Sequence, residues 1–196
     1  MGKKLIAFIG IDGAGKTTII DKTLKSLKEN GIKCRRRYMG LGREYQLGFV
    51  EFLIKVYRKS KEISNKEIDS PSNYRERTFS WVAVQYLELW ARYIRENLRK
   101  EDVILFDRYF YDGLILGNKK AFSFFRRLTP RPTKCFLIYA RPEIIRKRKK
   151  EAEIKDIKNF YKKVDELKKY FDIETIDNNK DLEKVIKKIV EKIKNA

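Results

Sequence analysis

An apolar run at residues 5–9 leads directly into Gly-Ile-Asp-Gly-Ala-Gly-Lys-Thr at residues 10–17, and a segment with helical periodicity follows. This is the full spacing of a P-loop, set between a predicted strand and a predicted helix as that motif requires. The glycines let backbone N–H groups turn inward around phosphate oxygens, and the start of the helix adds the positive end of its dipole. The motif therefore predicts that ATP is bound by Gly10, Asp12, Gly13, Ala14, Gly15, Lys16, Thr17 and Thr18.

Two side chains of this loop are predicted to carry its chemistry. The Lys16 ammonium is expected to reach the β- and γ-phosphates, and the Thr17 hydroxyl is expected to bind Mg²⁺. A P-loop by itself predicts nucleotide binding and leaves the reaction open among GTPases, ATPases and kinases. The stretch at 117–120, Gly-Asn-Lys-Lys, is not followed by the aspartate that selects guanine, which disfavours a GTPase.

The rest of the chain alternates between short apolar runs and longer segments with helical periodicity. This alternation predicts parallel strands joined by helical crossovers, with ligands bound at the carboxyl ends of the strands. The length of 196 residues fits one domain over 1–196. The predicted fold is α/β, a three-layer P-loop sandwich with a five-stranded parallel sheet. Strands are expected near 5–9, 32–38, 103–106, 134–139 and 171–176. Helices are expected near 16–29, 45–59 and 74–99, somewhere between 111 and 128, from 142, and near 154–169 and 181–193.

Composition limits the chemistry and the partners. The chain has no histidine, so no imidazole base is present, and Cys34 and Cys135 are expected to be buried, reduced thiols. No apolar run is long enough for a signal peptide or a membrane span, which predicts a soluble, cytoplasmic protein. The net charge of +20 would suit nucleic acid, but it is spread over helix faces without a recognisable RNA-binding or helicase motif. We interpret the charge as a lysine-rich surface of the kind that hot-growing organisms often have, and do not expect nucleic acid as a partner.

Three stretches of the chain resemble the thymidylate kinases. Asp12, with the second threonine at position 18, makes the loop similar to that of this group. Residues 103–109, Val-Ile-Leu-Phe-Asp-Arg-Tyr, resemble its second motif, in which an apolar strand ends in Asp-Arg-Tyr. Residues 139–149, a strand end followed by Pro-Glu and a basic helix, resemble the start of the kinase LID. The resemblance extends from residue 4 to about 193.

The resemblance implies roles for residues outside the loop. Asp107 is expected to assist Mg²⁺ and the phosphates, and Arg108 to clamp phosphate at the point of transfer, where a guanidinium fork matches phosphate oxygens. A short LID is expected at about 141–153, with arginines that close over ATP. The expected catalytic set is Lys16, Asp107, Arg108 and Arg148, with Arg141 and Arg146 as second choices in the LID, and the expected metal ligands are Thr17 and Asp107.

The predicted acceptor site departs from this family. The family carries Arg-Xaa-Pro after its second strand, whereas residues 38–43 read Tyr-Met-Gly-Leu-Gly-Arg, and a gapless count places Tyr86 where the family has a thymine-binding arginine. Family geometry puts an aromatic side chain four residues before a hydrogen-bonding one, a spacing that Trp81 and Gln85 have on one helix face. A core position for Trp81 is the alternative. The acceptor candidates are Asp12, Arg43, Trp81, Gln85 and Tyr109, with Arg75 and Arg77 as further candidates for binding its phosphate.

These observations predict ATP- and Mg²⁺-dependent phosphoryl transfer to a nucleoside monophosphate, with dTMP as the expected acceptor. Two alternatives remain open: a kinase of the same fold that acts on another phosphorylated or hydroxylated acceptor, and a nucleic-acid-binding NTPase. Without histidine, catalysis would rest on positioning and on charge stabilisation by Mg²⁺, Lys16, Arg108 and the LID. The sequence leaves the oligomeric state open, with a homodimer among the states considered.

Overall fold

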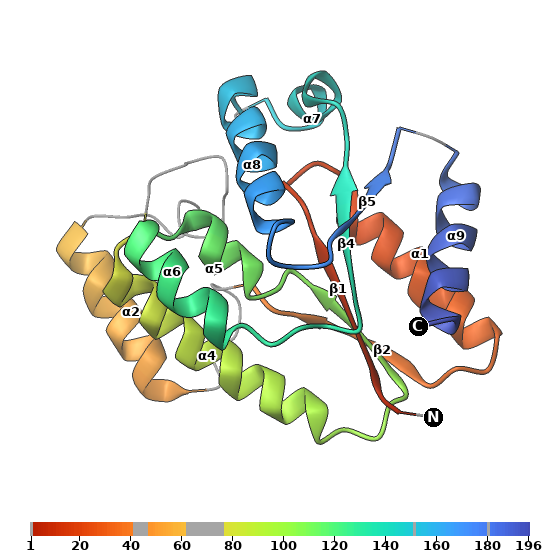
Figure 1. Ribbon diagram of the computed structural model, residues 1–196, viewed down its shortest axis with the longest axis horizontal. Helices are drawn as coiled ribbons and strands as arrows, with labels where there is room; N and C mark the ends of the chain where they lie inside the picture. The colour runs from red at the N-terminus through yellow and green to blue at the C-terminus, as the bar shows by residue number, and fades with distance from the viewer. Residues whose placement is uncertain (1, 41–46, 62–76, 151, 180) are drawn as a thin grey trace.

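A five-stranded parallel sheet forms the centre of the protein in the computed structural model, which describes residues 2–40, 47–61, 77–150, 152–179 and 181–196 (Figure 1). The strands lie in the order β2-β3-β1-β4-β5, and every neighbouring pair is parallel. The predicted α/β fold with five parallel strands is therefore confirmed. The strands are β1 (Lys4–Ile9), β2 (Cys34–Tyr38), β3 (Val103–Asp107), β4 (Lys134–Tyr139) and β5 (Glu174–Asp177).

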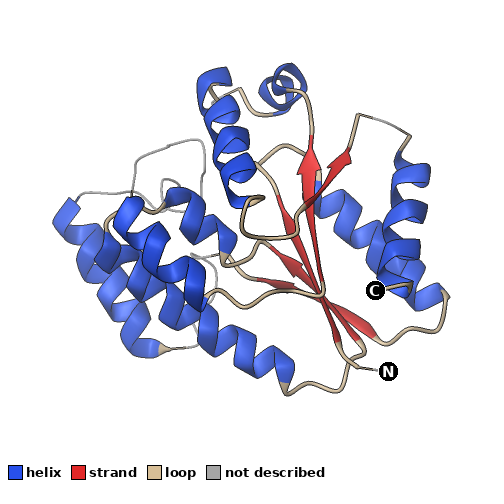
Figure 2. Ribbon diagram, in the orientation of Figure 1, coloured by secondary structure: helices blue, strands red, loops and turns tan. Residues whose placement is uncertain are grey.

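Helices lie on both sides of this sheet (Figures 1 and 2). In the described part of the chain they are α1 (Lys16–Glu29), α2 (Gly48–Lys61), α4 (Phe79–Asn97), α5 (Tyr111–Leu116), α6 (Lys119–Leu128), α7 (Pro142–Arg148), α8 (Ile154–Leu167) and α9 (Leu182–Lys194). One expected helix, 111–128, is two helices. The chain is extended at Gly117, and the Asn118 side chain accepts a hydrogen bond from the Ala121 N–H, so α6 begins with its own N-cap.

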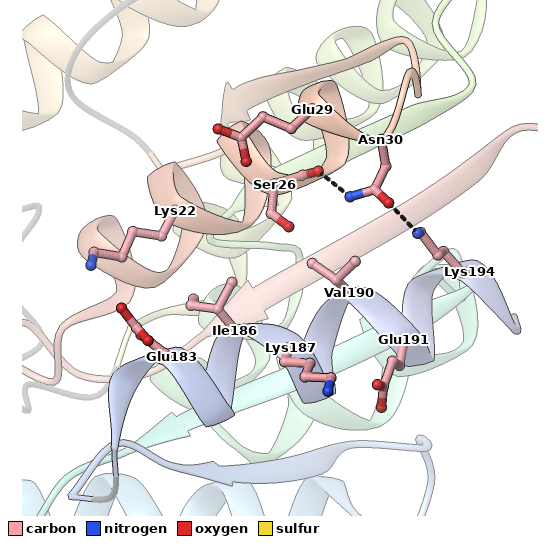
Figure 3. A pocket seen from close by; sticks show the side chains of 10 residues that line it. All are labelled: Lys22, Ser26, Glu29, Asn30, Glu183, Ile186, Lys187, Val190, Glu191 and Lys194. Atoms are coloured by element: carbon pink, nitrogen blue, oxygen red, sulfur yellow. Dashed lines mark hydrogen bonds between the residues drawn. The ribbon is translucent and has the colours of Figure 1, made fainter.

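The helices α1 and α9 pack side by side on one side of the sheet (Figures 1 and 3). At one end of this pair, the Asn30 side chain donates to the Ser26 carbonyl oxygen at 2.7 Å and accepts from the Lys194 Nζ at 2.6 Å. Ile186 and Val190 of α9 line the cavity between the two helices together with charged side chains of both signs. None of the residues that line this cavity belongs to a strand of the sheet.

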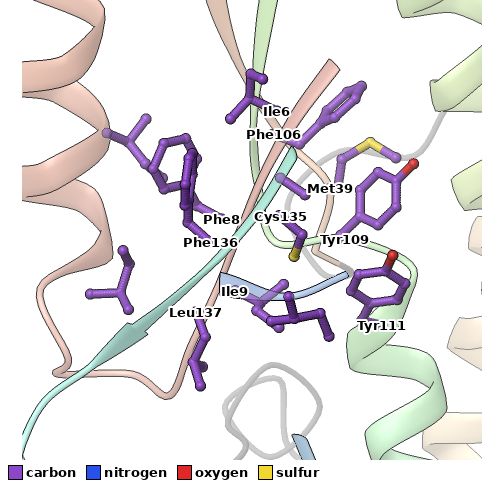
Figure 4. Close-up of a cluster of buried hydrophobic side chains, with 14 of the residues drawn as sticks. Ile6, Phe8, Ile9, Met39, Phe106, Tyr109, Tyr111, Cys135, Phe136 and Leu137 are labelled. Carbon is purple, nitrogen blue, oxygen red and sulfur yellow. The ribbon is translucent and has the colours of Figure 1, made fainter. Parts of the chain in front are cut away.

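The core surrounds the three central strands, β1, β3 and β4. Their side chains are buried along nearly their whole length, as expected for parallel strands that are covered on both faces. Figure 4 shows part of this core, where the rings of Phe8 and Phe136 pack with their centroids 5.6 Å apart. Cys34 and Cys135 are buried and form no disulfide, as predicted.

The sheet register brings three chain segments to one edge. Phe8 pairs with Asp107 across β1 and β3, and Tyr38 pairs with Asp107 across β2 and β3. The Arg108 backbone N–H then donates to the Phe8 carbonyl oxygen at 3.0 Å. The loop after β1, the Asp107–Arg108 pair after β3 and the end of β2 therefore meet at the carboxyl ends of the strands, where parallel sheets bind ligands.

Charged side chains of α4 point into the protein. Glu88 and Arg92 are 0% and 1% exposed, and Arg92 Nε donates to Glu88 Oε1 at 2.7 Å. Arg92 Nη1 also donates to the Gly40 carbonyl oxygen at 2.8 Å, and Glu88 Oε2 accepts from the Leu47 N–H at 3.2 Å. The pair therefore joins α4 to the chain after β2 and to the residue that precedes α2.

Removing one member of this ion pair is expected to destabilise the fold strongly. Arg92→Met keeps an apolar stem but removes the cation that donates to the buried Glu88 carboxylate, so we expect a loss of about 3–5 kcal/mol in the free energy of unfolding. Glu88→Leu combined with Arg92→Met removes both charges and should lower the free energy of unfolding less than Arg92→Met alone. Urea unfolding measures the free energy of unfolding of both variants. As a control, Lys168→Met breaks the exposed Lys168–Asp165 pair and should lower this free energy by less than about 1 kcal/mol. If Arg92→Met were as stable as Lys168→Met, the structural role of the Glu88–Arg92 pair would be contradicted.

Candidate active site

The loop between β1 and α1 has a backbone that only glycine adopts easily at three positions. Gly10, Gly13 and Gly15 have φ angles of 149°, 91° and 92°. A Cβ atom on Gly10 would lie 2.8 Å from the Ile138 carbonyl oxygen, and one on Gly15 would overlap the Asn178 amide. The glycines thus satisfy both the conformation of the loop and its close approach to β4 and to the chain after β5.

Lys16, the first residue of α1, folds back over this loop. Its buried ammonium donates to the carbonyl oxygens of Gly10 at 2.7 Å and Ile11 at 3.0 Å, and it lies 3.5 Å from Asp12 Oδ1. Burial and the nearby Arg108 guanidinium lower the pKa of Lys16, against the opposing effect of surrounding carboxylates. The ammonium is thus held at the wall of the loop by hydrogen bonds that an arriving phosphate could replace.

Arg108 lies between two carboxylates. Its Nη2 donates to Asp12 Oδ1 at 2.6 Å and its Nη1 donates to Asp112 Oδ2 at 3.0 Å. Arg108 has a φ of 70°, an unusual conformation for a residue with a side chain, and these contacts help to hold it there.

The protonation of this group follows from burial and charge. Burial raises the pKa of Asp112, and the Arg108 guanidinium only partly opposes that effect. At Asp12, burial would also raise the pKa, but Arg108 and Lys16 outweigh it and hold the pKa below its ordinary value. The Asp12 carboxylate is therefore charged at neutral pH and faces the cations of the site.

Asp107, the last residue of β3, is bound by Arg36 of β2. Arg36 Nη2 donates to Asp107 Oδ2, and Arg36 Nη1 donates to Asp21 Oδ1 at 2.7 Å. Burial would lower the pKa of Arg36, but hydrogen bonds and charges from both carboxylates raise it. Arg36 therefore connects β2, β3 and α1 at the edge of the site.

The end of α7 closes over the loop from the other side. Arg148 Nη1 donates to the Gly13 carbonyl oxygen at 3.1 Å, and the Asn178 amide donates to the Ala14 carbonyl oxygen at 2.7 Å. Pro142 at the first position of α7 has the φ that a helix start requires. Arg141 and Arg146 are exposed and are not among the residues that line the site. Of the predicted LID, 141–153, all residues except 151 lie in the described part of the chain.

These side chains line one cavity of about 840 Å³ at the carboxyl ends of the strands. Five of its lining residues are cationic and two are carboxylates, so the cavity suits a polyanion. Gly10 and Ala14 belong to the loop but do not line the cavity. The lining residues are Asp12, Gly13, Gly15, Lys16, Thr17, Thr18, Arg36, Tyr38, Asp107, Arg108, Arg148, Lys149, Asn178 and Leu182.

Most of the predicted acceptor residues lie elsewhere. Of the described candidates, Asp12 alone lines the cavity. Trp81 and Gln85 are buried on α4, with the Arg77 guanidinium 5.6 Å from the Trp81 ring centroid. Tyr109 is buried, and its hydroxyl donates to the Pro130 carbonyl oxygen at 3.1 Å. Arg43 and Arg75 lie outside the described residues.

Among the residues at the site that sequence reasoning did not identify are Arg36, Lys149 and Asn178, which line the cavity, and Asp112, which contacts Arg108. Asp112 stands four residues after Arg108, a spacing that brings side chains together near the start of a helix and could have drawn attention to it. Arg36 is the middle of three consecutive arginines in a predicted strand, a second detectable signal. Asn178 and Lys149 had no such signal, because only the tertiary structure brings the chain after β5 and the end of α7 to the loop.

The oxygen donors at the cavity fit Mg²⁺. The Thr17 hydroxyl at the start of α1 is exposed, and Thr17 and Asp107 both line the cavity. Mg²⁺ prefers oxygen ligands and is commonly bound by one or two protein groups together with phosphates and water. Within the described ranges, no group of three or more His, Cys, Asp or Glu side chains is placed to hold a metal ion.

Comparison with known proteins finds no family whose model matches this chain and no match among curated proteins. Across the described residues, no helix is both long enough and apolar enough to cross a membrane.

Proposed function

We propose that this chain is an ATP- and Mg²⁺-dependent phosphotransferase of the P-loop kinase class. The observation that carries the proposal is the convergence of Lys16, Arg36, Arg108 and Arg148 on one cavity beside a loop with three left-handed or extended glycines. Such a loop at the start of a helix is a site for phosphate, and the surrounding cations match the charge of a triphosphate. No histidine base is needed, because phosphoryl transfer depends mainly on positioning and charge stabilisation.

In this proposal each group has a distinct task. Lys16 leaves its loop carbonyls and binds the β- and γ-phosphates, while Arg148 approaches from α7 and neutralises charge at the far side of the loop. Arg108, fixed by Asp12 and Asp112, presents its guanidinium at the point of transfer. Thr17 and Asp107 would hold Mg²⁺, which offsets the phosphate charge when it is bound.

The acceptor that we propose is a nucleoside monophosphate, with dTMP as the first choice. This choice is supported by the resemblance of the loop and of residues 103–109 to the thymidylate kinases. A hydroxylated acceptor is the second candidate, and one observation favours it. Both terminal nitrogens of Arg108 are engaged by carboxylates, and the Asp12 carboxylate in the cavity could accept a hydrogen bond from a hydroxyl group.

An acceptor screen tests this proposal. Purified protein, Mg²⁺ and ATP are incubated with single nucleoside monophosphates, nucleosides and other polyols, and ADP release is measured for each. We expect dTMP to increase ADP release at least about tenfold over the rate without acceptor, a change in barrier of about 1.4 kcal/mol. If only a compound without phosphate increases the rate, the second candidate replaces the first. If ATP is bound but no acceptor of either class has an effect, the proposal of a small-molecule kinase is wrong.

A further inference from the structure

Three consecutive arginines of β2 point to opposite faces of the sheet, because successive side chains of a strand alternate. Arg35 and Arg37 face α4, where their Nε atoms lie 3.5 Å and 3.4 Å from the buried carboxylate of Glu96. Arg36 faces α1 instead, where it reaches Asp21 and lines the candidate active site. Two of the three arginines therefore compensate a buried carboxylate away from the cavity, and the third belongs to the site.

Arg36 bridges two carboxylates that differ in their exposure to water. Its Nη2 donates to Asp107 Oδ2, and its Nη1 donates to Asp21 Oδ1 at 2.7 Å. The Asp107 side chain is 6% exposed, whereas that of Asp21 is 55% exposed. Water solvates the Asp21 carboxylate, but a carboxylate as buried as that of Asp107 needs a cation close by. Arg36 supplies that cation by direct contact, and its contact with Asp21 adds little because exposed ion pairs are weak.

The contact between Arg36 and Asp107 affects the proposed metal ligand. The proposed function assigns Mg²⁺ to Asp107 and Thr17, and the role inferred for Arg36 rests on that assignment. A guanidinium in contact with Asp107 repels a divalent cation at the same carboxylate. Mg²⁺ also gives up its water ligands reluctantly, so a weakened carboxylate is a poor ligand for the free ion. Arg36 and the metal ion are therefore competitors for one buried charge.

We propose that Arg36 is a positioning residue that exchanges Asp107 for phosphate when a metal–nucleotide complex binds. The Arg36 side chain is 25% exposed and lines the same cavity as Lys16 and Arg108, so a phosphate in this cavity is within the reach of its guanidinium. A guanidinium fork matches phosphate oxygens as well as it matches a carboxylate. When Arg36 moves to phosphate, Asp107 is released to the metal ion, and its buried charge stays compensated throughout. Arg36 thus disfavours the free ion and admits the ion that arrives with phosphate.

Binding of Mn²⁺ to the full chain without nucleotide tests this exchange. Mn²⁺ takes the same oxygen ligands as Mg²⁺, and electron paramagnetic resonance measures its free concentration directly. We expect Arg36→Met to bind Mn²⁺ at least about tenfold more tightly than the wild type, the scale on which neighbours of a metal ligand alter its affinity. Asp107→Asn in the Arg36→Met background should remove this gain, because it removes the carboxylate that Arg36 contacts.

Further variants separate the charge of Arg36 from its packing. Arg36→Lys keeps the charge and should bind Mn²⁺ as weakly as the wild type. Arg36→Gln keeps a hydrogen-bond donor beside Asp107 without the charge and should gain affinity as Arg36→Met does. It takes the place of Arg36→Met if thermal melting shows that the methionine variant is unfolded. Arg127→Met, on the exposed side of α6, removes the same charge away from the cavity and should have no effect.

The outcomes separate this proposal from the proposed function. An unchanged Mn²⁺ affinity in folded Arg36→Met or Arg36→Gln would overturn the role of Arg36. A gain of equal size in Arg36→Lys, or a gain that survives Asp107→Asn, would overturn it as well. The measurement uses neither ATP nor turnover, so a protein that binds no ATP contradicts the proposed function, whereas the Mn²⁺ affinities bear on Arg36 and Asp107.

Discussion

Lys16→Ala is expected to lower ATP-dependent ADP release by about 10³-fold, because a single group that stabilises developing charge contributes on that scale. The Lys16 ammonium is buried at the wall of the loop, where it donates to two loop carbonyl oxygens and lines the cavity. Alanine at this position removes the charge that is proposed to follow the γ-phosphate. The opened space adjoins the cavity, so water can reach the freed carbonyl oxygens and the fold should persist.

The matched control for this variant is Lys28→Ala, the same substitution in an exposed last-turn residue of the same helix. It should leave ADP release unchanged within about twofold. Circular dichroism and thermal melting establish that both variants are folded. If folded Lys16→Ala retained near-normal turnover, the assignment of the loop at residues 10–17 to phosphate binding would be wrong.

Arg108→Lys is expected to lower turnover by about 10²-fold, although it keeps the positive charge. In the structure, one guanidinium uses two separate nitrogens to bridge Asp12 and Asp112. A lysine ammonium is a point charge that cannot maintain both contacts while also presenting a planar fork to phosphate. The effect should appear mainly in kcat. The charge at the point of transfer develops in the transition state and is smaller in the ground state with ATP bound.

A partner variant separates catalysis from stability at this position. Asp112→Asn keeps the shape of the side chain, removes one buried carboxylate beside Arg108, and should affect turnover less than Arg108→Lys. Arg127→Lys, on the exposed side of α6, is the control for the arginine-to-lysine change itself and should have no effect. Full activity of Arg108→Lys would show that Arg108 has only a structural role, as part of an ion pair.

The sequence predicted the features of the fold that depend on local pattern. The continuous apolar run at 5–9 identified a central parallel strand, because such a strand is buried on both faces, and the runs at 103–106 and 134–139 identified two further strands of the sheet. The glycines at 10, 13 and 15 predicted a loop, and their φ angles show why side chains are disfavoured there. The sequence predicted one helix between 111 and 128, where the structure has two. The break at Gly117 and the cap at Asn118 are short-range signals within a helical pattern.

Features that depend on tertiary contacts could not be predicted in this way. The periodicity of α4 indicated a helix but not which side faces the protein, because the Glu88–Arg92 ion pair is buried while Leu87 and Ile94 are exposed. For the same reason, Trp81 and Gln85 share a helix face as expected and yet lie away from the cavity. Arg36, Asp112 and Asn178 reach the site because β2, the start of α5 and the chain after β5 lie near one edge of the sheet.

Isothermal titration of the wild type with MgATP tests whether the loop at residues 10–17 binds the phosphates of ATP. We expect one ATP to bind per chain, with competition by inorganic tripolyphosphate, since the cations that line the cavity address the phosphates. Lys16→Ala should weaken this binding at least about tenfold, a change of about 1.4 kcal/mol. A folded wild-type protein that binds no ATP, or that binds it equally well after Lys16→Ala, would contradict the account.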